Sequence, residues 1–376
     1  MPVEMAFGIA ATVLQAPNNE DAAMRVVSAA SWAHERVDLF GPIVAEEGAA
    51  GSAGTAHRFH GTDGWSKVEL VTAAEPLIAS EATSACSWGE GRLDLVGPVR
   101  LKVDDGGWAS GIGHTYFDAA TGWGRWDFLG GPAEGSPRVV TWGAGRLDVF
   151  CWADDNCFHQ WFDSATGWSS WESVPELRLP DRVYSLVVVA PAPGVIDIFG
   201  ASSDQADEPA PAQPIGNAGA MIPDPNAVLT PSWTPERYVW DGLWHAGYRA
   251  DGPITGWFGW EQMAIPGIDG ERFWTVTAVP DVDSPDAEIV GVRDRPRPRS
   301  AVLIAGIDLI MKARYDGANW VAAPVAARGK YFRDAIACSA PRGSRNDLFL
   351  NKVDGPGIYH YWSNDAGETY QGPEQL

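Results

Sequence analysis

The chain has 376 residues, which is enough for two or three average domains but is also the length of one large all-β domain. Its 19 tryptophans, 42 glycines and 28 prolines exceed ordinary usage and are spread along the whole chain, which favours a repeated all-β unit. The formal net charge of −22 argues against nucleic acid and anionic membranes as partners, because binding to phosphate groups needs a basic surface.

The first residues, 1–24, precede the repeats. An apolar run from Met5 to Leu14 has only Glu4 close ahead of it and no basic residue, so we expect no secretory signal peptide. No other apolar run approaches the roughly 20 residues that a membrane-spanning helix needs, so no membrane insertion is expected. These residues are expected to form an N-terminal extension or a cap strand. The compartment stays undecided between the cytoplasm and release without a conventional leader.

Three anchors then recur in fixed order along the chain. The first is a strand of alternating apolar and polar residues around an Asp, which is typical of a half-buried strand. Its copies are Val37-Asp38-Leu39-Phe40, Arg92-Leu93-Asp94-Leu95, Arg146-Leu147-Asp148-Val149-Phe150, Ile196-Asp197-Ile198-Phe199 and Asn346-Asp347-Leu348-Phe349, with a weaker one at Glu288-Ile289-Val290. The second anchor is a His or Lys just ahead of an aromatic residue, at His57, His114, His159, His245, Lys312 and His360. The third is a Gly-Trp closing strand, clear at Trp65, Trp123, Trp168 and Trp257 and weaker at Trp320 and Tyr370.

Six copies of each anchor predict six units of four short antiparallel strands. One such unit cannot bury both of its faces, and stacking around a closed ring solves that problem. The sequence therefore predicts an all-β fold, a single closed β-propeller domain over residues 1–376 with six blades, and leaves seven open. A tryptophan on each closing strand is expected to fill the wedge between blades.

The connections between the second and third strands differ in length from unit to unit. The repeated Asp and His lie closest together in unit 3, at Asp148 and His159, and farthest apart in unit 4, at Asp197 and His245. The fifth unit is interpreted from Glu288 to Lys312. These spacings predict that all extra chain lies on one rim, including an irregular loop insertion over 201–237 in blade 4. A rebuilt rim favours one elaborate pocket over several equal sites.

The third unit, from Val140 through His159 to Glu172, resembles the repeat of the Photorhabdus-type (PLL-like) fucose-binding lectins, which are seven-bladed propellers. The resemblance is strong in units 2 and 3 and poor in unit 5. It implies a non-catalytic carbohydrate-binding lectin with several shallow sites between blades, recognising fucose or O-methylated sugars. Such sites stack the apolar face of a sugar on an aromatic ring and bind its hydroxyls with polar side chains. The residues of this kind in the sequence are Trp152, Asp154, Asp155, Asn156, Trp240, Asp241 and Trp244.

The alternative is an enzyme, or a single-site binder of a small and even anionic molecule, with its pocket on the loop-rich face at the mouth of the central channel. An Arg-x-x-Ser/Thr pattern opens several innermost strands, and guanidinium groups around one opening suit carboxylates or phosphates. The candidate lining residues are Trp108, Tyr238, Trp240, Trp274, Arg138, Arg182 and Arg272. Pairing of each Arg with a nearby carboxylate is the structural alternative. The repeated Asp and His favour a structural hydrogen bond, because a catalytic pair is needed only once.

No metal-ligand spacing, nucleophile motif or nucleotide-binding loop occurs, so no metal or cofactor is expected. The acidic run from Asp281 to Glu288 lacks the spacing of a calcium loop. Glycans or a small molecule are the expected partners, and a homo-oligomer is left open. Cys151 and Cys157 flank a short turn, so the sequence allows a local disulfide there or four reduced thiols.

Overall fold

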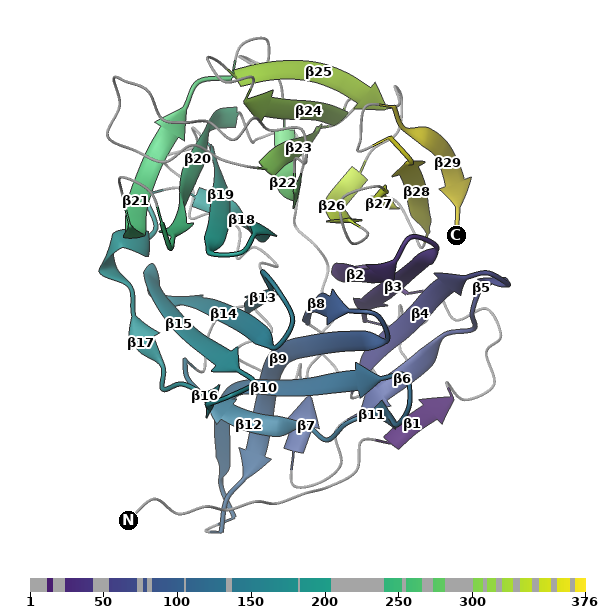
Figure 1. The fold of residues 1–376 in the computed structure, drawn as a ribbon, viewed down its shortest axis with the longest axis vertical. Helices are drawn as coiled ribbons and strands as arrows, with labels where there is room; N and C mark the ends of the chain where they lie inside the picture. The colour runs from purple at the N-terminus through teal and green to yellow at the C-terminus, as the bar shows by residue number, and fades with distance from the viewer. Residues whose placement is uncertain are drawn as a thin grey trace, which may run out of the picture.

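The computed structural model describes residues 12–15, 24–42, 54–72, 77–79, 83–104, 106–132, 137–181, 183–203, 240–251, 255–265, 273–280, 300–306, 310–315, 320–326, 332–339, 345–352, 357–365 and 369–376. Over these ranges the chain forms six antiparallel sheets, which follow one another around a central axis (Figure 1). This arrangement confirms the closed β-propeller, and the sheets are blades 1 to 6 in chain order.

Blade 1 contains β2 (Ser28–Ala33), β3 (Arg36–Gly41), β4 (Thr55–Gly61), β5 (Gly64–Trp65) and β6 (Glu69–Thr72), with β1 (Thr12–Gln15) paired to β6. Blade 2 contains β8 (Ser84–Gly89), β9 (Arg92–Lys102), β10 (Trp108–Asp118), β11 (Gly122–Trp123) and β12 (Asp127–Gly130), with β7 (Leu77–Ala79) paired to β9. Blade 3 contains β13 (Arg138–Val140), β14 (Arg146–Ala153), β15 (Asn156–Asp163), β16 (Gly167–Trp168) and β17 (Glu172–Ser173), followed by the short 3₁₀ helix η1 (Pro175–Leu177).

Blade 4 contains β18 (Val183–Ala192), β19 (Val195–Ser203), β20 (Trp240–Arg249) and β21 (Gly256–Met263). Blade 5 contains β22 (Phe273–Pro280), β23 (Ser300–Gly306), β24 (Ile310–Tyr315) and β25 (Trp320–Ala326). Blade 6 contains β26 (Phe332–Ser339), β27 (Asn346–Lys352), β28 (Ile358–Ser363) and β29 (Gln371–Gln375).

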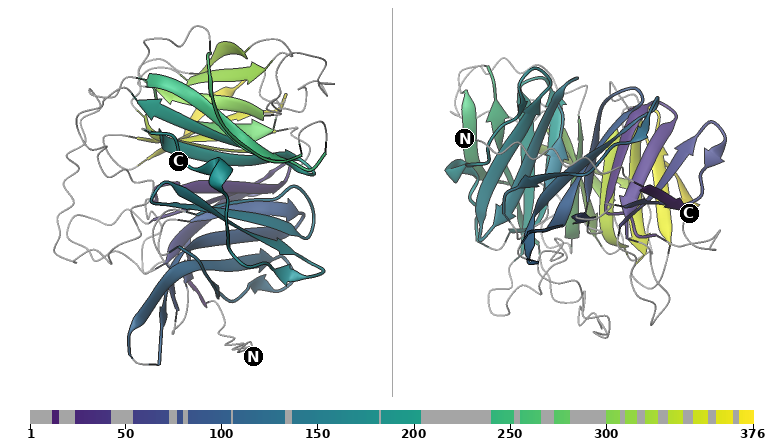
Figure 2. Two further views of the ribbon diagram at one scale, coloured as in Figure 1. Left: turned by 90° about the vertical axis from the view of Figure 1, so that its left-hand side faces the viewer. Right: turned by 90° about the horizontal axis from the view of Figure 1, so that it is seen from below.

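The first strand of every blade lies nearest the axis, and the fourth lies at the periphery (Figure 1). Figure 2 shows the ring from its edge, with the sheets standing side by side and the strands crossing the thickness of the ring. In blades 1 to 3 the fourth strand is split into two short pieces, such as β16 and β17. No helix in the described part of the chain has the length and apolar character needed to span a membrane.

The hydrophobic core is divided among the interfaces between neighbouring blades, which we call seams. In the described residues each of the six seams holds one cluster of buried apolar side chains. The closing-strand tryptophans of blades 1 to 5 reach back to the preceding blade, as predicted. The ring centroids lie 5.5 Å apart for His57 and Trp123, 5.1 Å for His114 and Trp168, 5.1 Å for His159 and Trp257, and 5.8 Å for His360 and Trp65. Edge-on ring contacts of this kind add to the apolar area that the seams bury.

The ring closes between blade 6 and blade 1 without sharing a strand between them. Asn351 Nδ2 donates to the Val26 carbonyl oxygen at 2.7 Å, and the Val26 N–H donates to Asn351 Oδ1 at 3.0 Å. The N-terminal strand β1 instead extends the outer edge of blade 1 through its pairing with β6. Side-chain packing and this amide pair therefore hold the two ends of the ring together.

Blade 5 departs from the sequence-based assignment. Its second strand is β23 at Ser300–Gly306, and residues 288–290 lie outside the described residues. Leu303 lies opposite Lys312, the register that Phe150 and His159 have in blade 3, so Ala301 replaces the repeated Asp. The prediction that Glu288-Ile289-Val290 forms the second strand of blade 5 is therefore wrong.

This shift also corrects the prediction for the connections. In blade 5 the long connection, residues 281–299, lies between the first and second strands, whereas in blade 4 residues 204–239 lie between the second and third. Because neighbouring strands are antiparallel, these two kinds of connection leave opposite ends of a blade. The prediction that all extra chain lies on one rim is wrong for blade 5. In blade 4, β19 continues through Ser203, so the irregular segment begins later than residue 201.

All four cysteines are free. The register of the β14–β15 hairpin pairs Cys151 with Phe158 and Trp152 with Cys157, so the two thiols point to opposite faces of the sheet. Cys151 packs in the seam with blade 2 and Cys157 in the seam with blade 4. This geometry excludes the local disulfide, which requires both sulfur atoms on one face.

Candidate functional site

The repeated Asp and His form hydrogen bonds between the second and third strands, as the structural alternative predicted. The distance from His Nε2 to Asp Oδ1 is 2.8 Å for His57–Asp38, 2.9 Å for His114–Asp94, 3.0 Å for His159–Asp148, 3.1 Å for His245–Asp197 and 2.8 Å for His360–Asp347. All ten side chains are buried. A ligand on the surface would not contact these pairs, so they serve the fold.

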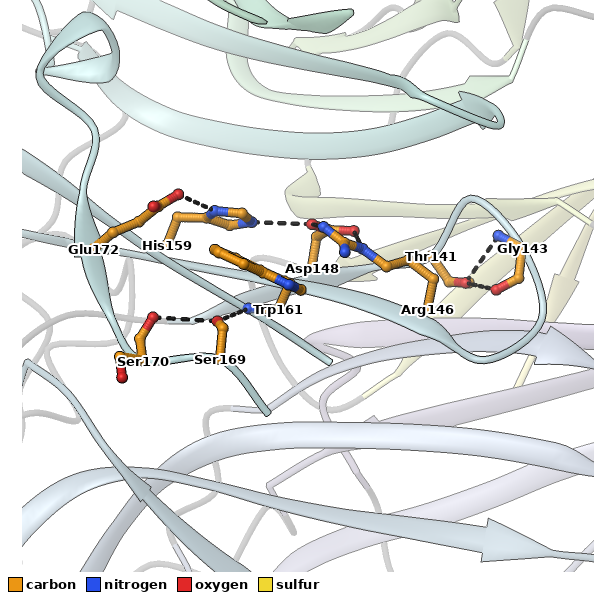
Figure 3. A network of polar contacts seen from close by, with 9 residues as sticks. All are labelled: Thr141, Gly143, Arg146, Asp148, His159, Trp161, Ser169, Ser170 and Glu172. Carbon is orange, nitrogen blue, oxygen red and sulfur yellow. Dashed lines mark hydrogen bonds and ion pairs between the residues drawn. The ribbon is translucent and has the colours of Figure 1, made fainter. Parts of the chain in front are cut away.

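An arginine two residues before the Asp completes the pair. In blade 3, Arg146 donates from Nε and Nη2 to the two Asp148 oxygens at 2.9 and 2.7 Å (Figure 3). Arg36, Arg92 and Arg345 bind their aspartates in the same way. These arginines were not among the predicted site residues, although Arg-x-Asp recurs in the sequence. Their guanidinium groups neutralise buried carboxylates, which are costly to bury unpaired.

The second ring nitrogen of three of these histidines faces a carboxylate on the fourth strand. His Nδ1 lies 2.6 Å from Glu69 in blade 1, 3.0 Å from Glu172 in blade 3 and 3.5 Å from Glu374 in blade 6. The glutamate side chains are 31%, 45% and 48% exposed, so their outer oxygens reach solvent. Burial opposes the charged form of His57, but its bonds to the two carboxylates outweigh burial and raise its pKa.

Each of these glutamates lies beside the closing-strand tryptophan of the next blade, because both contact the same histidine. The pairs are Glu69 with Trp123, Glu172 with Trp257 and Glu374 with Trp65. We call these three interfaces the Glu–Trp seams. Each offers a partly exposed carboxylate next to a half-buried indole ring. This combination can bind the hydroxyls of a sugar while an apolar ring face lies on the tryptophan.

The predicted ligand residues of blade 3 lie at the end of the β14–β15 hairpin, and their role as ligands stays a prediction. Trp152 is buried and donates from Nε1 to the Leu177 carbonyl oxygen at 3.1 Å. Asp154 and Asp155 are exposed and form the β14–β15 turn with φ of 48° and 62°, in the left-handed region that short polar residues tolerate. Asn156 donates to the Asp154 carbonyl oxygen at 2.9 Å. Trp152 packs inside the seam between blades 3 and 4, the seam of Glu172 and Trp257, whereas Asp154, Asp155 and Asn156 lie exposed in the turn.

The other predicted aromatic residues that the structure describes lie in blades 2, 4 and 5. Trp244 is half-buried and donates from Nε1 to Ser202 Oγ at 3.0 Å. Trp108 begins β10, is 38% exposed and lies 5.4 Å from the Arg100 guanidinium. It pairs with Lys102 at the turn end of the long β9–β10 hairpin. Trp240 and Asp241 lie in β20 and Trp274 lies in β22, whereas Tyr238, Arg182 and Arg272 lie outside the described residues.

Of the three arginines predicted to line the mouth of the central channel, Arg138 lies within the described residues and Arg182 and Arg272 do not. Arg138 lies in the innermost strand β13 and donates from Nε to the Leu186 carbonyl oxygen of blade 4 at 3.4 Å. Burial lowers the pKa of Arg138. At the corresponding position of blade 2, where the sequence has Glu81 in place of the arginine, the hydroxyl of Ser84 accepts a hydrogen bond from the Val139 N–H of the next blade at 3.1 Å. The first strands of neighbouring blades are therefore linked by side-chain hydrogen bonds at these two positions.

Comparisons with known proteins support the fold. No protein-family model matches the sequence, and no curated protein matches it. The structure is similar to the Aleuria aurantia lectin in complex with Fucα1-6GlcNAc, with a TM-score of 0.56, 10% identity and coverage of 94% of this chain and 97% of that chain. Another structure of that lectin is described as a six-bladed β-propeller with a novel fucose recognition mode.

Two further solved structures have comparable similarity. The SapL1 lectin in complex with α-methyl fucoside has a TM-score of 0.52 and 14% identity, and the match covers 95% of this chain and 97% of that chain. The α-L-arabinanase of Penicillium chrysogenum in complex with arabinobiose has a TM-score of 0.52 and 12% identity, with coverage of 96% and 99%. At these identities the comparisons establish the propeller architecture of the whole chain.

Proposed function

We propose that the protein is a non-catalytic carbohydrate-binding lectin that recognises fucose or O-methylated sugars at the seams between its blades. The observation that carries the proposal is the repeated placement of a partly exposed glutamate beside a half-buried tryptophan in the Glu–Trp seams. The similarity to the Aleuria aurantia and SapL1 lectins supports it, because both were solved with fucose-containing ligands.

The chemistry of the seams suits such ligands. A deoxy or methylated sugar carries an apolar edge that gains free energy on an indole ring, while its hydroxyls donate to a carboxylate. In blade 1 the Glu69 carboxylate is ready to accept, because His57 holds it ionised and lowers its pKa against the effect of burial. The histidine also fixes the orientation of the glutamate, which reduces the entropy lost on binding.

Repetition adds a second argument. A single shallow seam binds one sugar weakly, but several seams on one molecule bind a multivalent glycan with avidity. The resemblance of the third unit to the Photorhabdus-type lectins supports this multivalent reading. The Asp–His pairs are excluded from ligand contact by burial, so the glutamate and the tryptophan are the residues that recognise the sugar.

The test combines a glycan array with calorimetry on α-methyl fucoside and O-methylated monosaccharides. We expect each seam to bind sugar with millimolar affinity. The triple variant Glu69→Gln, Glu172→Gln and Glu374→Gln should weaken binding about tenfold, because each site loses roughly one charge-assisted hydrogen bond. Glu90→Gln, in the exposed turn between β8 and β9, is the control and should bind as the native protein does. Absence of any signal at millimolar sugar would contradict the proposal.

A further inference from the structure

The turn end of the β9–β10 hairpin presents an open face with one aromatic ring, two cations and a hydroxyl. Lys102 lies directly opposite Trp108, and Arg100 lies directly opposite Ser110, so these four side chains share one face of the hairpin. Leu101 points to the other face and packs against the core cluster between blades 1 and 2. Lys102, Trp108 and Ser110 are exposed, and Arg100 is half-buried. We call Arg100, Lys102, Trp108 and Ser110 the hairpin block.

Arg100 differs from the other arginines that lie over an aromatic ring. In the described part of the chain six arginines do so, and five of them also bind an acceptor of the protein. Arg36, Arg92, Arg146 and Arg249 bind an aspartate, and Arg58 binds a carbonyl oxygen. Arg100 lies 5.4 Å from the centroid of the Trp108 ring and forms no hydrogen bond or ion pair with a described residue. It therefore has the ring contact of the others without their acceptor.

The ring and the carboxylate act together on those other arginines. Arg36 lies over the Trp32 ring at 4.5 Å and donates from Nε and Nη2 to the two Asp38 oxygens at 2.9 and 2.7 Å. The ring restrains the guanidinium, and the carboxylate binds along its edge. At Arg100 the ring is present and the edge is free. None of its unpaired nitrogens is buried, so a carboxylate from solution can reach them.

The charges around the block favour an anionic ligand. Acidic residues outnumber basic ones by 49 to 27 in this chain, so a surface cation ordinarily has a carboxylate within reach. Among the described residues neither Arg100 nor Lys102 forms an ion pair, and Asp104, exposed in the hairpin turn, reaches neither of them. Two neighbouring cations that the described chain leaves without a carboxylate are complementary to a negative group.

We propose that the hairpin block binds a sugar acid, a sugar ring that carries one carboxylate. This site is separate from the Glu–Trp seams and goes beyond the proposed function. The carboxylate accepts two hydrogen bonds from the Arg100 fork, Lys102 compensates its charge, and Ser110 bonds a hydroxyl. In a uronic acid the carboxylate is bonded directly to the sugar ring. A carboxylate on Arg100 therefore brings an apolar edge of the ring to Trp108, which is 38% exposed.

The rigidity of a uronic acid favours it over an acidic peptide, because its charge and its apolar edge are already fixed relative to each other and little entropy is lost on binding. The two kinds of site then select opposite ligands. In the Glu–Trp seams a glutamate faces the ligand and repels a second carboxylate, whereas the hairpin block attracts it.

The decisive variant is Arg100→Gln, which removes the cation and its fork. Trp108→Leu removes the ring that restrains Arg100. Asp104→Asn removes the nearest carboxylate in the sequence and should tighten binding of an anion. Arg125→Gln is the matched control, because Arg125 is an exposed arginine of the same blade, between β11 and β12. Circular dichroism and the urea midpoint check that all four variants fold.

Calorimetry with sodium glucuronate and with methyl glucoside, its neutral counterpart, measures the affinity. We expect the native protein to bind glucuronate at least tenfold more tightly than methyl glucoside, and Arg100→Gln to weaken glucuronate binding about tenfold. Trp108→Leu should also weaken it, added salt should weaken it, and Arg125→Gln should leave it unchanged. α-Methyl fucoside, titrated into the same proteins, should bind all of them equally.

Equal affinity for glucuronate and methyl glucoside, or equal binding of glucuronate by the native protein and Arg100→Gln, would overturn the site. An equal loss in Arg125→Gln would reduce it to general charge attraction and overturn it too. A peptide of alternating glutamate and serine that binds through Arg100 while glucuronate does not would overturn the ligand class. Glucuronate binding without any fucoside binding would leave this site standing and contradict the proposed function, and the reverse result would do the opposite.

Discussion

Arg249 donates from Nη2 to Asp197 Oδ1 at 2.7 Å, although it lies on a different strand from the arginines that bind the equivalent aspartates. In blades 1, 2, 3 and 6 that arginine is two residues before the Asp on the same strand. Blade 4 has Val195 at that position, and Arg249 lies directly opposite Val195 in the register. The guanidinium thus reaches the same carboxylate from across the sheet, so the blade requires a cation at this point and accepts it from either strand.

The first prediction concerns this ion pair. Arg249→Met leaves the buried Asp197 carboxylate without its cation and should lower the free energy of unfolding by about 3 kcal/mol. Urea denaturation measures the loss. The exchange Val195→Arg with Arg249→Val recreates the arrangement of the other blades and should recover most of the stability. A single substitution without effect, or an exchange as unstable as the single variant, would contradict the argument.

A second prediction separates two histidines by their pH dependence. The carboxylates around His57 raise its pKa in the folded state, so its contribution to stability is full below about pH 6.5 and is lost as the pH rises through the folded value. The free-energy cost of His57→Gln should therefore shrink as the pH increases. Urea denaturation of both proteins measures this cost at a series of pH values above about pH 5, where Glu69 stays ionised.

His245 is the matched control for that experiment. Burial lowers its pKa, and Arg249 adds to this effect against the bond to Asp197. Its neutral form is favoured in the fold, so its contribution is full above about pH 6.5 and is lost as the pH falls through the folded value. The cost of His245→Gln should grow as the pH increases, opposite to His57→Gln. Parallel pH profiles for the two variants would refute the assignment.

The third prediction concerns the hydroxyl links between blades. Ser84→Ala removes the acceptor of the buried Val139 N–H and should cost about 1–2 kcal/mol, because an unsatisfied buried donor loses its hydration. Thr141 is the control from the corresponding position of blade 3, since the hydrogen bonds of its hydroxyl lie within its own turn, to Gly143. Thermal unfolding of both variants should show a clearly larger shift for Ser84→Ala, and equal shifts would count against the link.

The fourth prediction is that the protein carries four thiols. Burial raises the pKa of Cys151 to about 12 and raises the pKa of Cys157 as well, so both should react slowly with a thiol reagent in the folded protein. Unfolding in denaturant without reductant should expose four reactive thiols per chain. A count of two thiols would show that Cys151 and Cys157 do not lie on opposite faces of the β14–β15 hairpin.

The repeats made the architecture predictable. Strands with a period of two and a Gly-Trp closing strand occur in fixed order along the chain. Because the pattern recurs, a weak copy in one unit did not change the number of units, and the six blades and the tryptophans in the seams were predicted correctly. Blade 5 shows the limit: Ala301 replaces the Asp, and without that anchor the second strand was placed too early.

The site was less predictable, because it is formed between blades. Trp152 was predicted as a sugar ligand, but the sequence did not show that its ring is buried and that its Nε1 donates to the Leu177 carbonyl oxygen. Glu172 and Trp257 each belong to the closing strand of their own repeat, so the sequence showed both residues. Their proximity depends on how blade 3 packs on blade 4 through His159, and a single-unit pattern does not contain that information.

The most direct test of the central claim is a crystal structure of the native protein soaked with α-methyl fucoside at millimolar concentration. The account predicts sugar density at the seams, with an apolar edge on Trp65 or Trp257 and hydroxyls within hydrogen-bond distance of Glu374 or Glu172. Density confined to the mouth of the central channel, or crystals that remain free of sugar while calorimetry shows no heat of binding, would contradict it.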